Sequence, residues 1–240
     1  SKMSGMSGIR SNDFGFSRPL YSLIAVRFFG SFSVQLQSVI LGWQMYRLTR
    51  EPLDLGLVGL AEAIPALSLA LFAGYYVDRK NPRRIISAVI FLSLISMLIA
   101  WFSKTPGQLY FSAFLTGVAR SFYSPSFQSL LPRLVPKTSL NRAIALGTSA
   151  MKLAYVSGPA VGGIVLGWAG SDVAYGLGTT FLLLALGAIV SMSYDHAPYS
   201  RRAPVKISFL TELFAGIKFV FTHRILLSVL SLDMFAVLFG

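Results

Sequence analysis

The sequence predicts an all-α integral membrane protein: a bundle of six membrane-spanning helices followed by the start of a seventh. Hydrophobic residues make up 54% of the 240 residues, and charged residues only 12%, about half the share typical of a soluble domain. Six apolar stretches are each long enough to cross a hydrocarbon core of about 30 Å. Lipid removes the need for a charged surface, so both observations place the chain in the membrane class.

The predicted spans follow a Ser/Gly-rich start at residues 1–18, which we expect to be flexible. Together they form a predicted bundle at residues 19–193. Several spans contain Gly, Pro or a charge, which is typical of helices whose inner faces line a cavity. The spans cover about residues 20–46, 55–77, 85–102, 108–131, 143–168 and 174–192.

A connector at residues 194–224 separates the bundle from the last apolar stretch. Apolar residues in its second half recur at helical spacing, for example Leu210, Leu213 and Ile217. This pattern predicts an amphipathic helix on the membrane surface, and a helix that binds a soluble partner is the alternative. The stretch at residues 225–240 reaches about 24 Å, so we expect a truncated seventh span and a fragment of a longer protein.

Lysine and arginine are shared unevenly between the two sides of the predicted bundle. Fifteen of the 21 lie in the N-terminus, the connector and the loops on their side, whereas Arg47, Arg50 and Lys104 lie opposite. The positive-inside rule therefore predicts a multi-pass cell-membrane protein with a cytoplasmic N-terminus. The same distribution accounts for the net charge of +12, so we expect no nucleic-acid partner.

The composition also argues against several kinds of chemistry. The chain has no cysteine and only two histidines, His196 and His223, which lie in polar stretches. We therefore expect no metal site and no cofactor. No cluster of catalytic side chains and no phosphate-binding glycine loop is present, so we do not expect an enzyme or a nucleotide-driven pump.

One motif fills the predicted loop between the second and third spans. Residues 74–84 read Gly-Tyr-Tyr-Val-Asp-Arg-Lys-Asn-Pro-Arg-Arg. Gly74 would let two helices approach closely, and Asp78 could cap a helix or pair with an arginine. We expect a gating latch formed by these two residues with Arg79, Arg83 and Arg84. The alternative is a basic loop that serves topology alone.

A second motif lies in the fifth span, where Gly158, Pro159, Gly162 and Gly163 occur within six residues. Proline removes a backbone hydrogen bond and bends a helix, and the glycines permit tight packing. The alternative is ordinary packing, because Gly and Pro are common in membrane helices.

These motifs resemble those of the major facilitator superfamily. The loop is similar to its Gly-x-x-x-Asp-Arg-x-Gly-Arg-Arg signature, although Asn81-Pro82, with one extra residue, replaces the second glycine. The second motif resembles the Gly-Pro-x-x-Gly-Gly motif of the superfamily's exporters. Residues 117–136 and 213–240 look like the bacterial drug and siderophore branch that includes the enterobactin exporter.

The resemblance implies a twelve-span transporter of the bacterial inner membrane, working by alternating access. This chain would be its N-terminal half, built from two inverted three-helix repeats. The implied partners are the lipid bilayer, a small-molecule substrate, protons and the C-terminal half. We expect proton-coupled export of small organic compounds; a lipid or lysolipid flippase of the same fold and a non-transporting scaffold are the alternatives.

Three cations lie inside the predicted spans. A charge at the centre of a membrane helix costs roughly 2.5–3.5 kcal/mol, so each is a candidate functional residue. Counting from the span ends places Arg27 about 10 Å deep, Arg120 about 16 Å and Lys152 about 14 Å. Such a basic cluster in a water-filled cavity would attract an anionic substrate. Arg27 could instead extend to the lipid headgroups.

Glu62 is the acidic residue inside the predicted spans. A buried carboxyl that cycles between its charged and neutral forms could couple protons to transport, and a structural partner for a cation or hydroxyl is the alternative role. Gln35 and Tyr155 would add polar contacts to a substrate.

Overall fold

The computed structural model describes residues 18–192. The expectations for residues 1–17, for the connector and for the seventh span lie outside the described residues. Across 18–192 the elements are all α-helices, which confirms the predicted fold class. They are α1 (Arg18–Thr49), α2 (Pro52–Arg79), α3 (Pro82–Trp101), α4 (Pro106–Leu134) and α5 (Leu140–Ser191).

Prolines begin three of the helices. Pro52, Pro82 and Pro106 open α2, α3 and α4, where a missing N–H costs no intrahelical hydrogen bond and the fixed φ suits the first turn. Asn81 caps α3, because its side-chain oxygen accepts a hydrogen bond from the Arg83 N–H at 3.0 Å. Short loops of two to five residues join consecutive helices.

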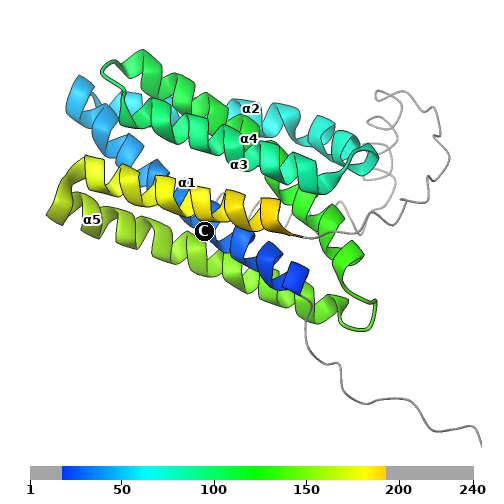
Figure 1. Ribbon diagram of the computed structural model, residues 1–240. Helices are drawn as coiled ribbons and strands as arrows, with labels where there is room; N and C mark the ends of the chain where they lie inside the picture. The colour runs from blue at the N-terminus through cyan, green and yellow to red at the C-terminus, as the bar shows by residue number, and fades with distance from the viewer. Residues whose placement is uncertain (1–17, 193–240) are drawn as a thin grey trace, which may run out of the picture. The chain divides into compact units, whose positions relative to one another are not determined.

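The long α5 contains two helical segments that meet at Gly170. This glycine has φ 84° and ψ 176°, a conformation that a side chain would strain. The chain reverses there, and the second segment runs back in the opposite direction (Figure 1). The break falls between the predicted spans at 143–168 and 174–192, so the described chain holds six helical segments where six spans were predicted.

The distribution of polar and apolar side chains suits lipid as the solvent. Large apolar side chains face outward, including Leu67 at 76% exposure and Trp168 at 91%, whereas serines such as Ser96 and Ser112 are fully buried. Within the described part, α1, residues 52–70 of α2, α3 and α5 are long and apolar enough to cross a membrane. The long α4 is more polar, and many of its hydroxyl side chains point inward.

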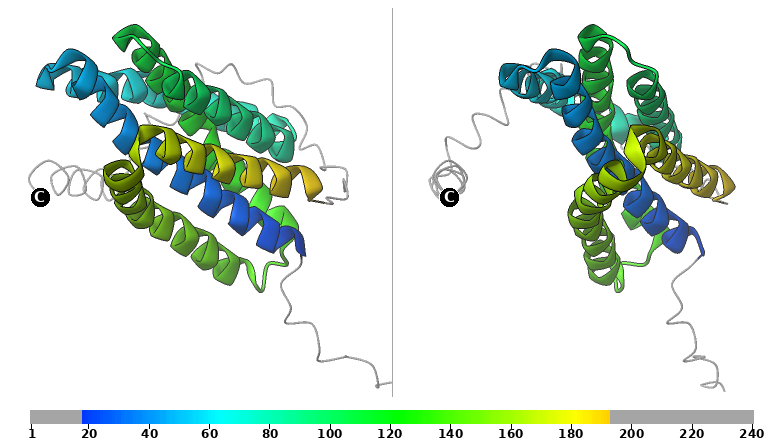
Figure 2. Two further views of the ribbon diagram at one scale, coloured as in Figure 1. Left: turned by 60° about the vertical axis from the view of Figure 1, so that its left-hand side comes forward. Right: turned by 90° about the vertical axis from the view of Figure 1, so that its left-hand side faces the viewer.

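The helices pack in two groups that meet where α3 contacts α5 and where α1 contacts α4 and α2. α1 lies along α5, and α4 lies beside both α2 and α3 (Figures 1 and 2). α1 also contacts α4 and α2, which places residues of three helices around the middle of the bundle. This arrangement positions the polar site described below.

Candidate functional site

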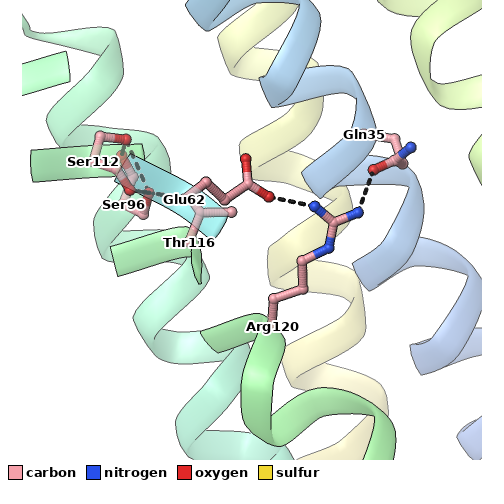
Figure 3. Close-up of polar contacts among 6 residues, drawn as sticks. All are labelled: Gln35, Glu62, Ser96, Ser112, Thr116 and Arg120. Carbon is pink, nitrogen blue, oxygen red and sulfur yellow. Dashed lines mark hydrogen bonds and ion pairs between the residues drawn. The ribbon is translucent and has the colours of Figure 1, made fainter. Parts of the chain in front are cut away.

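An ion pair between α2 and α4 forms the centre of the site. Arg120 donates from Nη1 to Oε1 of Glu62, and Figure 3 shows the two side chains directed toward one another. The Glu62 side chain is 17% exposed and that of Arg120 43%, so the pair lies at the edge of an opening rather than in the core. The structure thus joins two of the four charges that the sequence placed inside spans.

Two further predicted residues surround the Arg120 guanidinium. Nη2 of Arg120 donates to Oε1 of Gln35 on α1 at 3.4 Å, and the Tyr155 hydroxyl on α5 interacts with the same guanidinium. Gln35, Arg120 and Tyr155 line one pocket of about 30 Å³, together with Ser93 and Thr116. Residues from α1, α3, α4 and α5 therefore meet at one pocket, beside which α2 supplies the carboxylate.

Gly117 explains why Glu62 and Arg120 can meet. A Cβ at position 117 would collide with the backbone oxygen of Glu62 and would lie 2.6 Å from Cγ of Pro65. The backbones of α2 and α4 therefore touch at this level, three residues before Arg120. Close backbone contact at a small residue is a common way to join helices in membranes.

A buried hydroxyl network lies next to the ion pair. Nε2 of Gln37 donates to the Ser96 and Ser112 hydroxyls at 3.0 and 3.1 Å, which ties α1 to α3 and α4. The Ser96 hydroxyl also lies 2.8 Å from that of Thr116 (Figure 3). All four side chains are at most 5% exposed. Satisfied buried networks of this kind fix helix positions.

Glu62 also faces this network across a second, smaller cavity. A space of about 20 Å³ is lined by Glu62, Gln37, Ser38, Val58 and other residues of α1, α2 and α4. Oε1 of Gln37 is buried and accepts no hydrogen bond there. Glu62 therefore pairs with Arg120 and shares a cavity with Gln37, whose side-chain oxygen lacks a hydrogen-bond donor.

The other two cations lie apart from the pair. Arg27 is partly buried on α1, with Nη2 donating to Sδ of Met151 at 3.4 Å and its guanidinium 5.2 Å from the Phe127 ring centroid. It lines a different pocket, of about 340 Å³, with Gln128 and Thr148. Lys152 is exposed on α5. Arg27 and Arg120 thus line different pockets, and both interact with Tyr155.

The motif at residues 74–84 differs from its predicted geometry at two positions. A Cβ at Gly74 would meet no atom within 4 Å, so the expected close helix approach does not occur within the described part. The helix cap comes from Asn81 rather than Asp78, which is exposed at the end of α2. The gating role of Asp78 remains a prediction.

The arginines of this motif have individual partners. Arg79 contacts Tyr75, with its guanidinium 3.7 Å from the ring centroid. Arg83 donates from Nε to the Ile189 carbonyl at 3.1 Å and from Nη2 to the Val190 carbonyl at 2.7 Å. Arg84 is exposed. Arg83 therefore holds the end of α5 against the start of α3.

The glycines of the second motif pack α5 against α1. A Cβ at Gly158 would lie 2.9 Å from both Cβ of Gln35 and the Phe32 oxygen, and one at Gly162 would lie 3.3 Å from Cγ of Leu36. Tight packing is confirmed at these two positions. Gly163 differs, because a Cβ there would meet nothing within 4 Å, and α5 continues through Pro159 until the break at Gly170.

Sequence reasoning identified Gln37 as a source of polar contacts, but it missed Gly117 as the contact point and Ser96, Ser112 and Thr116 as the network around Gln37. A signal for the network exists in the four-residue spacing of Ser112 and Thr116 on one face of a helix. In the part of the chain that the structure describes, no group of three or more His, Cys, Asp or Glu side chains could hold a metal ion. The Glu62 carboxyl can form or break its ion pair with Arg120 and can hold a proton.

Comparison with known proteins identifies relatives. A family model described as transmembrane secretion effector matches residues 16–240. The chain is 31% identical over 132 residues to an uncharacterized MFS-type transporter of Sinorhizobium fredii, covering 52% of this chain and 32% of that protein.

Two named transporters are also similar to the chain. A multi-drug resistance efflux pump PmrA homolog of Lactococcus lactis is 30% identical over 113 residues, covering 47% of this chain and 28% of the pump. A staphyloferrin A transporter of Staphylococcus aureus is 25% identical over 152 residues, covering 61% and 37%. The chain spans about a third of the length of the curated relatives it matches.

Proposed function

The chain belongs to the transmembrane secretion effector family of the major facilitator superfamily, and on that premise we propose that the whole protein exports small organic compounds in exchange for protons. It is a multi-pass membrane protein. This chain contributes the N-terminal six-helix bundle, and a C-terminal half completes the transporter. The name of one relative, a multi-drug resistance efflux pump PmrA homolog, supports export, and the name of another, a staphyloferrin A transporter, supports transport.

The ion pair of Glu62 and Arg120 is the observation that carries the proposal. Arg120 lines the pocket of about 30 Å³, Glu62 lines the neighbouring cavity of about 20 Å³, and both side chains are partly exposed. Protonation removes the charge of Glu62, which breaks the ion pair and frees Arg120 from α2. A proton thereby changes which helices are tied together, as alternating access requires.

The ion pair also sets the sign of coupling between proton and substrate. An anionic group that replaces Glu62 at Arg120 makes Glu62 easier to protonate, so proton and anion bind together. A cationic group that pairs with Glu62 needs the charged carboxylate, so it competes with the proton. Exchange requires competition, and we therefore propose that the compounds exported against protons carry a cation.

An anionic substrate is the second candidate, and Arg27 favours it. The Arg27 guanidinium has a buried Nε without a hydrogen-bond partner and lines the pocket of about 340 Å³. A carboxylate or phosphate there would pair with a cation that is separate from Glu62. Binding of such a compound would be coupled only weakly to protonation of Glu62.

Reconstitution of the full-length protein in proteoliposomes tests these proposals. A proton gradient is imposed, and flux of a panel of organic cations and anions is followed together with internal pH. Counterflow of protons and cations is expected, and Glu62→Gln should abolish the dependence of flux on the gradient. Glu51→Gln, the same change at the exposed residue before α2, is the control.

The alternatives give different outcomes in the same vesicles. Movement of fluorescent lysolipid between leaflets, without flux of any soluble compound, would identify a flippase. Absence of both activities would support a membrane scaffold. Flux of cations that ignores the proton gradient would remove proton coupling from the proposal.

A further inference from the structure

The side-chain amide of Gln37 is hydrogen-bonded at its nitrogen but not at its oxygen. Its side chain lies on α1, only 2% exposed, and Nε2 donates to Ser96 and Ser112. Oε1 of the same amide is buried and accepts no hydrogen bond. A buried acceptor without a donor costs free energy, and such groups are rare in native proteins.

The side chains of Gln37 and Glu62 line the same cavity. The space of about 20 Å³ is lined by both side chains, by the Ser38 and Thr116 hydroxyls, and by apolar residues such as Val58. It is large enough for one water molecule or for a carboxyl group that turns into it. Thr116 already donates to the Ser112 carbonyl at 3.2 Å and contacts Ser96, so it is engaged elsewhere.

The charge state of Glu62 decides whether its carboxyl group can donate a hydrogen bond to Gln37. A charged carboxylate only accepts hydrogen bonds, so it pairs with Arg120 and can offer nothing to Oε1 of Gln37. A protonated carboxyl has one O–H donor and no charge to hold Arg120. The two partners of Glu62 therefore match its two protonation states, an arginine for the anion and an amide oxygen for the neutral acid.

We propose that protonation moves the Glu62 carboxyl from Arg120 to Gln37, with the neutral carboxyl donating its proton to Oε1 of Gln37 directly or through one water molecule. The proton comes from the aqueous opening beside Arg120, stays on Glu62, and returns when the ion pair forms again. This inference rests on the proposed function, because it supplies the acceptor for the coupling proton.

The move would exchange one helix contact for another. With Glu62 charged, α2 is tied to α4 through Arg120; with Glu62 neutral, α2 is tied to α1 through Gln37. Gln37 is itself fixed to α3 and α4 by the hydroxyl network, so the second position is as well defined as the first.

Few other charges act on Glu62 within the described helices. α4 presents Arg120, and α1 presents the uncharged Gln35, Gln37 and Ser38. The Tyr155 hydroxyl of α5 interacts with Arg120. The charged residues of α3, Arg83 and Arg84, lie at its first turn, about three turns from the level of Ser96.

Infrared titration of the full-length protein in lipid tests the inference without any substrate. The carbonyl band of protonated Glu62 is identified as the band that Glu62→Gln removes. Gln37→Leu should shift this band and lower the pH at which half of the carboxyl is protonated by about 0.5–1 unit, the worth of one hydrogen bond. The sign follows because Gln37 binds only the protonated form.

Two further variants distinguish a hydrogen bond between Gln37 and Glu62 from a general effect of the substitution on folding. Val58→Ile adds one methyl group to the cavity and leaves every bond of Gln37 in place, and it should shift the titration in the same direction. Gln44→Leu removes a partly buried glutamine of α1, which bonds the Ala100 and Ser103 carbonyls and the Tyr175 hydroxyl, and it should leave the titration unchanged.

The outcomes distinguish this inference from the proposed function. Unchanged titration in both Gln37→Leu and Val58→Ile would overturn the inference, even if proton-driven flux is observed. A titration midpoint that follows sodium concentration would also overturn it, since the cavity would then hold a cation. Absence of proton-driven flux, with the expected infrared shifts present, would contradict the proposed function alone.

Discussion

The backbone of Gly117 in α4 lies against the backbone oxygen of Glu62 in α2, so closely that a Cβ at position 117 would collide with it. This contact brings α2 and α4 together at the level of the Glu62–Arg120 ion pair. The two atoms that such a Cβ would meet belong to rigid parts of α2, the Glu62 backbone and the Pro65 ring. Neither can move aside without a cost in free energy.

Gly117→Ala should therefore lower the free energy of unfolding by about 1–3 kcal/mol, the usual cost of overpacking. Thermal unfolding of the detergent-solubilised protein measures the change. Gly187→Ala is the control, because a Cβ there meets nothing within 4 Å and should be neutral or stabilising by up to about 1 kcal/mol. Equal stability of the two variants would contradict the contact.

Arg83→Ala should lower the free energy of unfolding by about 1 kcal/mol, because two hydrogen bonds to the Ile189 and Val190 carbonyls are lost at the end of α5. Arg84→Ala removes an equal charge from the exposed neighbouring position and is the control. Chemical denaturation of both variants measures the difference. A larger loss in Arg84→Ala would argue against the carbonyl contacts.

Ser96→Ala should cost about 1–3 kcal/mol, since it leaves partners of a fully buried hydroxyl unsatisfied on α1 and α4. Ser87→Ala on the same helix is the matched control, because the Ser87 hydroxyl donates only to the Arg83 carbonyl of its own helix. Thermal unfolding should separate the two. If Ser96→Ala is as stable as Ser87→Ala, the network does not hold the helices.

Single cysteines should report the orientation, because this chain contains no cysteine of its own. Lys104→Cys, in the loop between α3 and α4, should react with a membrane-impermeant maleimide added outside intact cells. Lys137→Cys, in the loop between α4 and α5, should react only after the cells are opened. The reverse pattern would overturn the predicted cytoplasmic N-terminus.

The number and approximate position of the helical segments within residues 18–192 followed from the sequence alone. A bilayer fixes how long an apolar helix must be, so the six stretches could be found by length and hydropathy. Even the break within α5 was located, because Gly170 lies in the short interval between two apolar stretches. The charges inside spans were equally visible, since an ionisable residue stands out in an apolar helix.

Only the tertiary structure decided which of these charges meet. Counting residues gave the depth of Arg27, Arg120 and Lys152, but depth says nothing about the direction in which a side chain leaves its helix or about the neighbouring helix. Glu62 pairs with Arg120, 58 residues away, because Gly117 lets α2 and α4 touch at that level. The partners of Gln37 could not be predicted either, because they come from α3 and α4. Contacts between helices depend on how the helices pack, and the sequence of one helix does not determine that packing.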